Sequence, residues 1–483
     1  MLQMVHYAWI YLTAGVSVLL SALTMGHAII YKRDSRAAVG WVGLIWLAPI
    51  IGPFLYLLLG INRVRRRASK VQRDEHGHLT DDLPATCSLA ELGTTLPDHA
   101  AHLLEMARMN ERLTDVPLLK GNEVTPLRNG DEAYPAMLKA IAEAERSITL
   151  TTYIFDNDTN GHVFADALAD AVRRGVEVRV LIDAVGARYS LPPITHRLRQ
   201  QGVRTARFMP SYLPWTTPYF NLRSHRKILV IDGQHGFTGG MNIRGGNMLA
   251  ADDPHPTRDI HFYVRGPVVH ELQATFVQDW YFTTGEELRA APWFSPIQES
   301  GDVIARAIHD GPDKDYDKMR SAFQGALAVA ERHVKILTPY FLPDAALIGA
   351  LNTCALRGVQ VDIVVPRINN LKMVAWASMA QMWQILEWGC SVWLNPPPFD
   401  HSKVLVVDGH WSLIGSSNWD PRSLRLNFEL GLECYSCSLA EDLGRYIDER
   451  IRDATPLTLE HVNRRSLPVK LRDGMARLFA PYL

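Results

Sequence analysis

Two long uncharged stretches dominate the hydrophobic pattern at the start of the chain. No Asp, Glu, Lys or Arg occurs in residues 1–31, and residues 37–61 also lack these charges. A helix needs about 20 apolar residues to cross a bilayer, so both stretches are long enough. We therefore expect an N-terminal transmembrane helical hairpin. Pro49 and Pro53 interrupt the second stretch, and a kinked or re-entrant segment is the alternative there.

Basic residues flank both stretches and set the expected topology. The connection carries Lys32, Arg33 and Arg36, and the sequence INRVRRRASK at residues 61–70 is richer still in Arg and Lys. Cytoplasmic loops carry the excess of these residues. We therefore expect everything after the hairpin to lie in the cytoplasm.

From about residue 120 the pattern changes to alternating amphipathic helices and buried strands. AMLKAIAEAERSITLTTYIF, from residue 136, reads as a helix followed by a strand, and HVFADALADAVRRGVEVRVLID, from residue 162, repeats that order. GALAVAERHVKILTPYF and IGALNTCALRGVQVDIVVP, from residues 325 and 348, match these two units and share the tripeptides AER and RGV with them. This alternation predicts an α/β fold, and a repeat of this length predicts duplicated domains rather than a solenoid.

The repeat also suggests domain boundaries. We assign residues 1–65 to the membrane anchor, 66–120 to a linker or amphipathic region, 121–290 to the first domain and 300–483 to the second. The turn-rich stretch TTGEELRAAPWFSPIQES, residues 283–300, separates the two domains.

One motif recurs at the same place in both domains. HRKILVIDGQHGFTGGMN, from His225, and HSKVLVVDGHWSLIGSSN, from His401, both obey H-x-K-x4-D-x6-G-[GS]-x-N. Each motif position is displaced by the same number of residues, so chance is a poor explanation. The apolar run after each lysine predicts a buried strand, with the His and Lys side chains two apart on one of its faces.

The amino-acid composition restricts the classes of ligand and of cellular compartment. The 483 residues include 50 Lys plus Arg against 51 Asp plus Glu, a net charge of -1 that argues against a generic nucleic-acid binder. The five cysteines form no regular framework, which fits a reducing compartment. Any anion-binding site must therefore come from local clustering.

Brought face to face, the two motifs suit a phosphodiester. Two ammonium groups can neutralise non-bridging oxygens, one neutral imidazole can attack phosphorus, and the other can protonate the leaving oxygen. We expect carboxylates behind the rings and a mainly structural role for the motif aspartates, which begin Asp-Gly turns. The candidate catalytic residues are His225, Lys227, Asp232, His401, Lys403 and Asp408; Asn242, Ser416 and Asn418 are candidate phosphate ligands, and Asp259 and Glu429 candidate histidine-orienting groups.

These motifs resemble the HKD signatures of the phospholipase D superfamily. The order of anchor, two HKD domains and short C-terminal segment is similar to that of the bacterial cardiolipin synthases, as are PIIGPFLYLLLG, TPYFLPD and FTGGMNI. The resemblance implies two tandem phospholipase D-like domains in a pseudo-twofold arrangement. It also implies a multi-pass protein of the bacterial inner (cytoplasmic) membrane. It also implies phosphatidyl transfer between two phosphatidylglycerol molecules through a phosphatidyl-histidine, with His225 as nucleophile and His401 as acid. Gly240 stands where the second copy has Ser416, and Asp259 where it has Glu429, which suggests unequal halves.

The expected reaction exchanges one phosphodiester for another, so it requires no cofactor or metal. The expected partners are membrane phospholipids, phosphatidylglycerol first and phosphatidylethanolamine as an alternative, and not nucleic acid; the sequence does not specify an oligomeric state. Alternatives within the superfamily are a phosphatidyltransferase or hydrolase that uses another alcohol, and a nuclease. A non-catalytic membrane scaffold is the alternative from a different class, and two complete motifs argue against it.

Overall fold

The computed structural model describes residues 2–32, 35–60, 85–210, 222–251, 253–289, 291–296, 298–312 and 315–480. These residues form two compact units, one from the N-terminal helices and one from the remainder of the chain. The basic flank expected at residues 61–70 lies outside the described residues.

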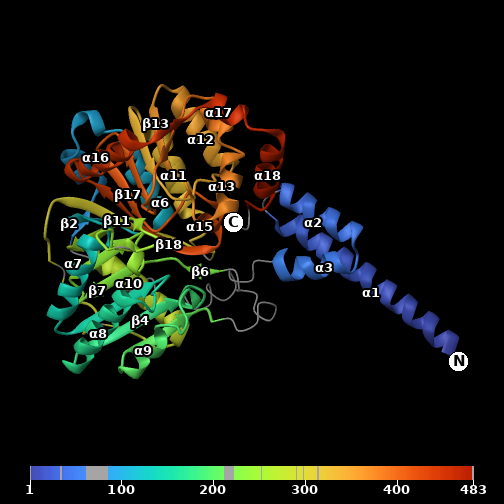
Figure 1. Cartoon of the computed structure of the whole chain (residues 1–483), viewed down its shortest axis with the longest axis horizontal. Helices are drawn as coiled ribbons and strands as arrows, with labels where there is room; N and C mark the ends of the chain where they lie inside the picture. Colours follow the sequence, from blue (N-terminus) through green and yellow to red (C-terminus); the bar gives the residue numbers. More distant parts are fainter. Residues whose placement is uncertain are drawn as a thin grey trace. The chain divides into compact units, whose positions relative to one another are not determined.

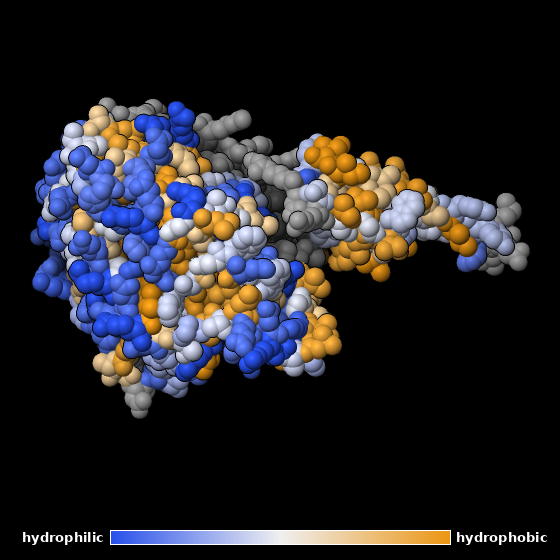
Figure 2. All heavy atoms as spheres, turned by 90° about the horizontal axis from the view of Figure 1, so that it is seen from above, coloured by the Kyte–Doolittle hydropathy of each residue, from blue (hydrophilic) through white to orange (hydrophobic). Residues whose placement is uncertain are grey.

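The N-terminal unit contains one long helix followed by a broken one. Helix α1 (Leu2–Tyr31) includes Trp9–Tyr31, the one stretch among the described residues that is long and apolar enough to cross a membrane. Helix α2 (Ser35–Leu47) spans roughly 20 Å, short of the roughly 30 Å hydrocarbon core of a bilayer. Short α3 (Ile51–Leu55) and a π-helical turn (Tyr56–Gly60) follow. The surface of this unit is rich in hydrophobic side chains (Figure 2).

Pro49 lies at the break between α2 and α3. It lacks an N–H and disfavours helical geometry at the residue before it, so α2 ends at Leu47. Its carbonyl accepts hydrogen bonds from Ser17 at 2.8 Å and Ser21 at 3.0 Å on α1. Gly52 then lets the chain fold back closely, because a Cβ there would lie 2.6 Å from the Cα of Ile45. The interruption expected at the prolines is thus present, and the predicted two-span hairpin is not confirmed.

The second unit is a long mixed sheet built from two similar halves (Figure 1). The strand order is β2-β10-β8-β7-β3-β4-β5 in the first half and β11-β18-β17-β16-β12-β13-β14 in the second, with β19 added at the outer edge. Antiparallel pairing of β2 with β11 joins the halves. The second half repeats the strand order of the first, which confirms the predicted α/β fold with two tandem domains.

The predicted helix and strand units appear in both halves. The first half comprises β2 (Leu118–Arg128), α7 (Asn129–Glu143), β3 (Ser147–Thr152), α8 (Thr159–Arg173), β4 (Glu177–Asp183), α9 (Thr195–Gln200), β5 (Arg204–Phe208), β6 (Arg223–Ser224), β7 (Ile228–Ile231), β8 (His235–Gly239), β9 (Thr257–Arg258), β10 (Ile260–Arg265) and α10 (Val269–Thr284).

The second half follows the same order and adds a C-terminal segment. It comprises β11 (Val303–Asp310), α11 (Lys318–Val329), β12 (His333–Leu337), α12 (Ala345–Leu356), β13 (Gln360–Pro366), α13 (Lys372–Met379), α14 (Trp383–Leu386), β14 (Ser391–Asn395), β15 (Phe399–Asp400), β16 (Val404–Val407), β17 (Trp411–Gly415), α15 (Pro421–Arg425), β18 (Asn427–Tyr435), α16 (Cys437–Asp453), β19 (Thr455–Leu457), α17 (Leu459–Asn463) and α18 (Leu467–Leu478).

Three hydrophobic layers hold this unit together. Helices α7 and α8 cover one face of the first half, and α11 and α12 cover the corresponding face of the second. A central core containing Leu272 of α10 and Leu443 of α16 spans both halves across the β2–β11 junction. The halves therefore share a core, and residues at their junction are held rigidly.

The segment before β2 belongs to this unit as well. It contains β1 (Thr86–Cys87), α5 (Leu89–Thr95) and α6 (Leu103–Thr114), and its apolar side chains join the core of the second half. Part of the stretch expected to be a linker is therefore packed. The exact domain boundaries stay a prediction.

Candidate active site

His225 is held by a strand from the opposite half. The short strand β6 pairs in parallel with the start of β18, and the His225 N–H donates to the carbonyl of Phe428 at 2.9 Å. The next residue of β18 is Glu429, whose two carboxylate oxygens both lie 3.0 Å from Nδ1 of His225. With Nδ1 engaged there, Nε2 is on the opposite side of the ring.

His401 has the mirrored arrangement. Strand β15 pairs in parallel with β9, and the His401 N–H donates to the carbonyl of Arg258 at 2.7 Å. Asp259, the next residue, has its Oδ2 at 2.9 Å from Nδ1 of His401. Each histidine is thus oriented by a carboxylate of the other half, so neither half alone contains a complete pair.

The two rings face a common space. Their centroids are 6.5 Å apart with an interplanar angle of 81°. Both line a cavity of about 1220 Å³ together with Asn242 and Asn418. Three residues that the motifs did not reveal also line it: Tyr153, with its ring 5.3 Å from that of His225, Tyr340, 6.2 Å from His401, and Phe399, 6.1 Å from His401. The recurrence of TTYIF as TPYF in the two halves was the available signal for the tyrosines.

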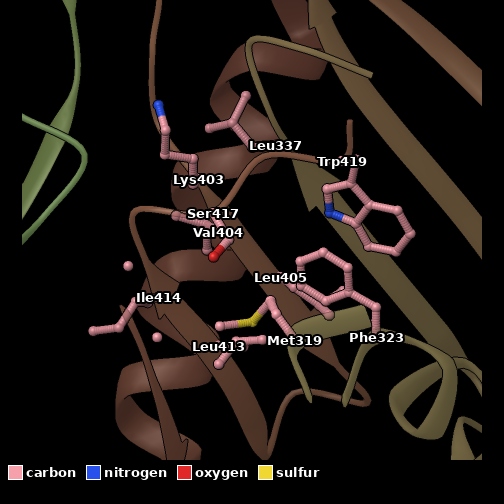
Figure 3. A pocket seen from close by; sticks show the side chains of 12 residues that line it. Met319, Phe323, Leu337, Lys403, Val404, Leu405, Leu413, Ile414, Ser417 and Trp419 are labelled. Carbon is pink, nitrogen blue, oxygen red and sulfur yellow. The ribbon is translucent and has the colours of Figure 1, made fainter. Parts of the chain in front are cut away.

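The two lysines lie behind the histidines, in the extended segments just before β7 and β16. Lys227 donates to the carbonyl of His225 at 2.6 Å, and Lys403 donates to that of His401 at 2.5 Å while lying 3.0 Å from both nitrogens of its ring. The ammonium of Lys403 points away from the apolar side chains that pack beneath its stem (Figure 3). Burial lowers the pKa of Lys227 well below its usual value and that of Lys403 to about 8. A bound anion would restore these charges.

Electrostatics separates the two histidine–carboxylate pairs. Burial and the nearby lysines lower the pKa of His225 to about 4, in spite of Glu429. Burial raises the pKa of Glu429, but His225, Lys227 and Ser416 outweigh it and leave that pKa below its usual value. In the other pair, burial raises the pKa of Asp259 to about 8, while burial and the lysines lower the pKa of His401 well below normal. At neutral pH the first pair is therefore ionised at its carboxylate, and the second retains a proton.

A single substitution between the repeats helps to explain this difference. The hydroxyl of Ser416 donates to Glu429 Oε2 at 2.5 Å and so favours the carboxylate. Its counterpart Gly240 has no donor, and a Cβ there would lie 2.7 Å from Oδ1 of Asp259. Ser416 was expected to bind the substrate phosphate. In this structure the hydroxyl is buried and directed at Glu429. A direct contact with the substrate phosphate stays a prediction.

The motif aspartates lie at the far ends of β7 and β16 from the histidines. Asp232 accepts backbone N–H bonds from residues 145, 146 and 147 at 2.7–3.0 Å, and Asp408 accepts the same three from residues 331, 332 and 333 at 2.7–2.9 Å. Both adopt a positive φ, 53° and 52°. The AER tripeptide recurs because it begins the loop that each aspartate holds. This geometry favours the structural interpretation over direct chemistry.

The two asparagines combine structural and cavity-facing positions. Asn242 accepts from the backbone N–H of Ile154 at 3.0 Å through Oδ1, which leaves its amide nitrogen as the atom able to donate to a ligand. Asn418 donates to Ser423 Oγ at 3.0 Å. Both residues line the cavity. Their role as phosphate ligands stays a prediction.

Comparison with known proteins places this site in a family. The family model described as "Cardiolipin synthase, PLD-like domain" matches residues 137–280 and 324–451, and "Phospholipase_D-nuclease N-terminal" matches residues 19–60. A cardiolipin synthase of Geobacillus kaustophilus is 33% identical over 97% of this chain and 93% of its own length. The major cardiolipin synthase ClsA of Bacillus subtilis is 30% identical over 94% of this chain and 95% of its own.

A solved structure supports the same fold. The phosphatidylserine synthase of Haemophilus influenzae superposes with a TM-score of 0.60 at 17% identity, covering 78% of this chain and all of that one. The family match extends over both repeated halves, and the relatives match almost the whole chain. The chain belongs to the phospholipase D-like cardiolipin synthase family.

Proposed function

We propose that this chain is a cardiolipin synthase that transfers a phosphatidyl group from one phosphatidylglycerol to another through a phosphatidyl-histidine at His225. The observation that carries the proposal is the pair of imidazoles 6.5 Å apart, each backed by a carboxylate of the opposite half, at one shared cavity. The relatives from Geobacillus kaustophilus and Bacillus subtilis are named cardiolipin synthases, which supports the same activity.

The first step forms a P–N bond. Neutral His225, oriented by ionised Glu429, attacks phosphorus through Nε2 while Lys227 and Lys403 neutralise the developing charge on the non-bridging oxygens. The P–O bond to the glycerol headgroup breaks, and the leaving oxygen takes a proton from His401. Asp259 supplies that proton, because its carboxyl holds one at neutral pH and contacts the Nδ1 of the same ring.

The second step reverses the proton flow. The terminal hydroxyl of a second phosphatidylglycerol gives its proton to His401 and attacks phosphorus. The P–N bond breaks, His225 is regenerated as the neutral imidazole, and cardiolipin is released. One phosphodiester replaces another, so the scheme uses no further reactant.

The cavity is suited to an acceptor that carries its own phosphate. Arg244 lines it, is about one-third exposed and pairs with Asp156 at 3.4 Å. Its charge contributes to the lowered pKa of His401, which places it on the side of the acid. Cardiolipin joins two phosphates through one glycerol, so the acceptor phosphate must lie in this same cavity. Arg244 is the cation we assign to it.

Mass spectrometry of the lipid products tests the proposal. Purified full-length enzyme is incubated with phosphatidylglycerol alone and then with phosphatidylethanolamine added. We expect cardiolipin and free glycerol in the first incubation. Phosphatidic acid instead would indicate a hydrolase, and cardiolipin formed only with phosphatidylethanolamine would indicate a different donor or acceptor. Cleavage of DNA under the same conditions would indicate a nuclease.

Trapping tests the covalent intermediate. A His401→Ala variant lacks the group that activates the acceptor, but it also lacks the group that protonates the glycerol leaving oxygen. The donor in this experiment is therefore phosphatidyl-p-nitrophenol, whose leaving group needs no proton. We expect a phosphatidyl adduct to accumulate at His225 and to be found on its peptide. The His225→Ala variant serves as the control without adduct. An adduct on another residue would contradict the assignment of the nucleophile.

A further inference from the structure

The C-terminal helix α18 keeps an apolar stripe on its outer face. Leu467, Leu471, Met475 and Leu478 are 69%, 58%, 64% and 76% exposed. Their spacing of three or four residues places them on one side of the helix. An apolar stripe on an otherwise basic helix is typical of a helix that lies in a membrane interface.

The opposite face of α18 packs against the second half, so the exposed stripe is not a face of the helix that belongs to the core. Ala476 is buried against α13 together with Ala377. Asp473 is buried and pairs with Arg465 and Arg472, and the guanidinium of Arg472 lies 4.6 Å from the ring centroid of Trp376 on α13. Packing on the second domain and contact with a membrane are therefore compatible, because they use opposite faces of the helix.

A second group of exposed apolar residues lines the catalytic cavity, in the segment that leads into α13, the helix on which α18 packs. Ile368, Leu371 and Met373, in the segment before and at the start of α13, are 63%, 48% and 43% exposed. All three line the cavity. We call residues 367–373 and the exposed residues of α18 the basic–apolar rim.

The charge on this rim has one sign. Arg367 and Lys372 are exposed beside the apolar residues of the loop, and Lys470, Arg472 and Arg477 are exposed on α18. The single acidic residue of α18, Asp473, is neutralised in its buried ion pairs. Cations interleaved with apolar side chains complement an anionic headgroup layer over acyl chains.

We propose that the basic–apolar rim docks on an anionic phospholipid bilayer and opens the cavity mouth to headgroups in that layer. The partner is a lipid surface, and the contact is interfacial and distinct from the N-terminal helix that is long enough to span a membrane. The proposal rests on the proposed function only in that the cavity receives phospholipid.

Fluorescence quenching tests the contact directly. Met475→Cys in a Cys437→Ser background is labelled with an environment-sensitive fluorophore, and the full-length chain is reconstituted into vesicles with spin-labelled lipid. The control label is on native Cys437, which is exposed at the start of α16. Helices α16 and α18 lie on opposite sides of the unit in Figure 1. We expect quenching at residue 475 and not at 437, stronger in phosphatidylglycerol than in phosphatidylcholine and weaker at high salt.

Two results would overturn the proposal. An unquenched, polar signal at residue 475 would mean that the rim faces water. A blue-shifted but unquenched signal would mean that protein covers it, either the N-terminal helices of the same chain or a second copy.

Kinetics separates this proposal from the proposed function. Leu471→Glu with Met475→Glu should lower turnover of long-chain phosphatidylglycerol in vesicles by about tenfold or more and leave short-chain substrate in solution within about twofold. Val163→Glu, at an exposed apolar position of α8, is the matched control. Equal losses on both substrates would contradict docking. If the unmodified chain turns over neither substrate, the proposed function fails and quenching alone decides the docking.

Discussion

At the scale of residues, the two motif histidines lie beside carboxyl groups in different protonation states. Glu429 has a hydroxyl donor and two nearby cations and stays ionised, whereas Asp259 lacks the hydroxyl and keeps a proton. Such a separation of neighbouring titratable groups supports the proposed assignment of His225 as nucleophile and His401 as acid. The asymmetry that Gly240 and Ser416 suggested in the sequence thus has a physical basis.

The pH dependence of kcat/KM should reflect the titration of both histidine–carboxyl pairs. Below a pH of about 4, His225 is protonated and cannot attack, and above about 8 the Asp259–His401 pair loses its proton while Lys403 loses charge. We expect a bell-shaped profile with a plateau between these values. Asp259→Asn should lower kcat and leave the acid limb in place; movement of the acid limb instead would reverse the assignment of the two histidines.

Removal of the Ser416 hydroxyl should weaken the first pair. Without its donor the pKa of Glu429 rises, so we expect Ser416→Ala to move the acid limb to higher pH and to lower kcat/KM by about tenfold. The matched control is Ser417→Ala, whose hydroxyl is buried without a hydrogen-bond partner among the described residues. Equal effects of the two changes would show that only packing is involved.

At the scale of elements, short strand pairs position the chemistry. β6 and β15 are each only two residues long, yet each fixes a histidine beside a carboxylate of the other half. The histidines and lysines were expected on buried strands, but these strands begin one residue after each lysine. The orientation of the two imidazole rings therefore comes from strand pairing between the two halves, and not from the alternation of side chains along one strand.

The motif aspartates should matter for stability. The Asp408 carboxylate accepts hydrogen bonds from three backbone N–H groups and from His102, in the segment before β2. Asp408→Ala removes these bonds, so we expect the free energy of unfolding to fall by about 2 kcal/mol or more. Asp232→Asn, which keeps an acceptor and tolerates a positive φ, should lose less than Asp232→Ala. Thermal unfolding measures both. An unchanged melting temperature with a lower rate per folded molecule would favour a chemical role.

At the scale of the whole molecule, the site exists only where two copies of one domain meet. The β2–β11 junction and the shared core fix the distance between the rings, so duplication created the site. The membrane topology is likewise a property of the whole chain, because it depends on how many apolar segments cross the bilayer.

Thiol labelling tests the predicted two-span hairpin. The prediction places the connection after α1 outside the cytoplasm and the catalytic unit inside. We expect an impermeant thiol reagent added to spheroplasts to label Lys32→Cys but not native Cys437, and to label both after lysis. Protection of both residues in intact spheroplasts would favour a re-entrant second segment, in keeping with the break at Pro49.

The sequence by itself determined the α/β class, the duplication, the apolar N-terminus and the twin motifs, because periodicity and spacing are local properties of the chain. It also singled out Glu429 and Asp259, but not which ring each orients. Those contacts join residues 204 and 142 positions apart, and only the tertiary structure brings them together. The same holds for the role of Ser416 and for the exposed stripe of α18, since each depends on what the folded chain packs against.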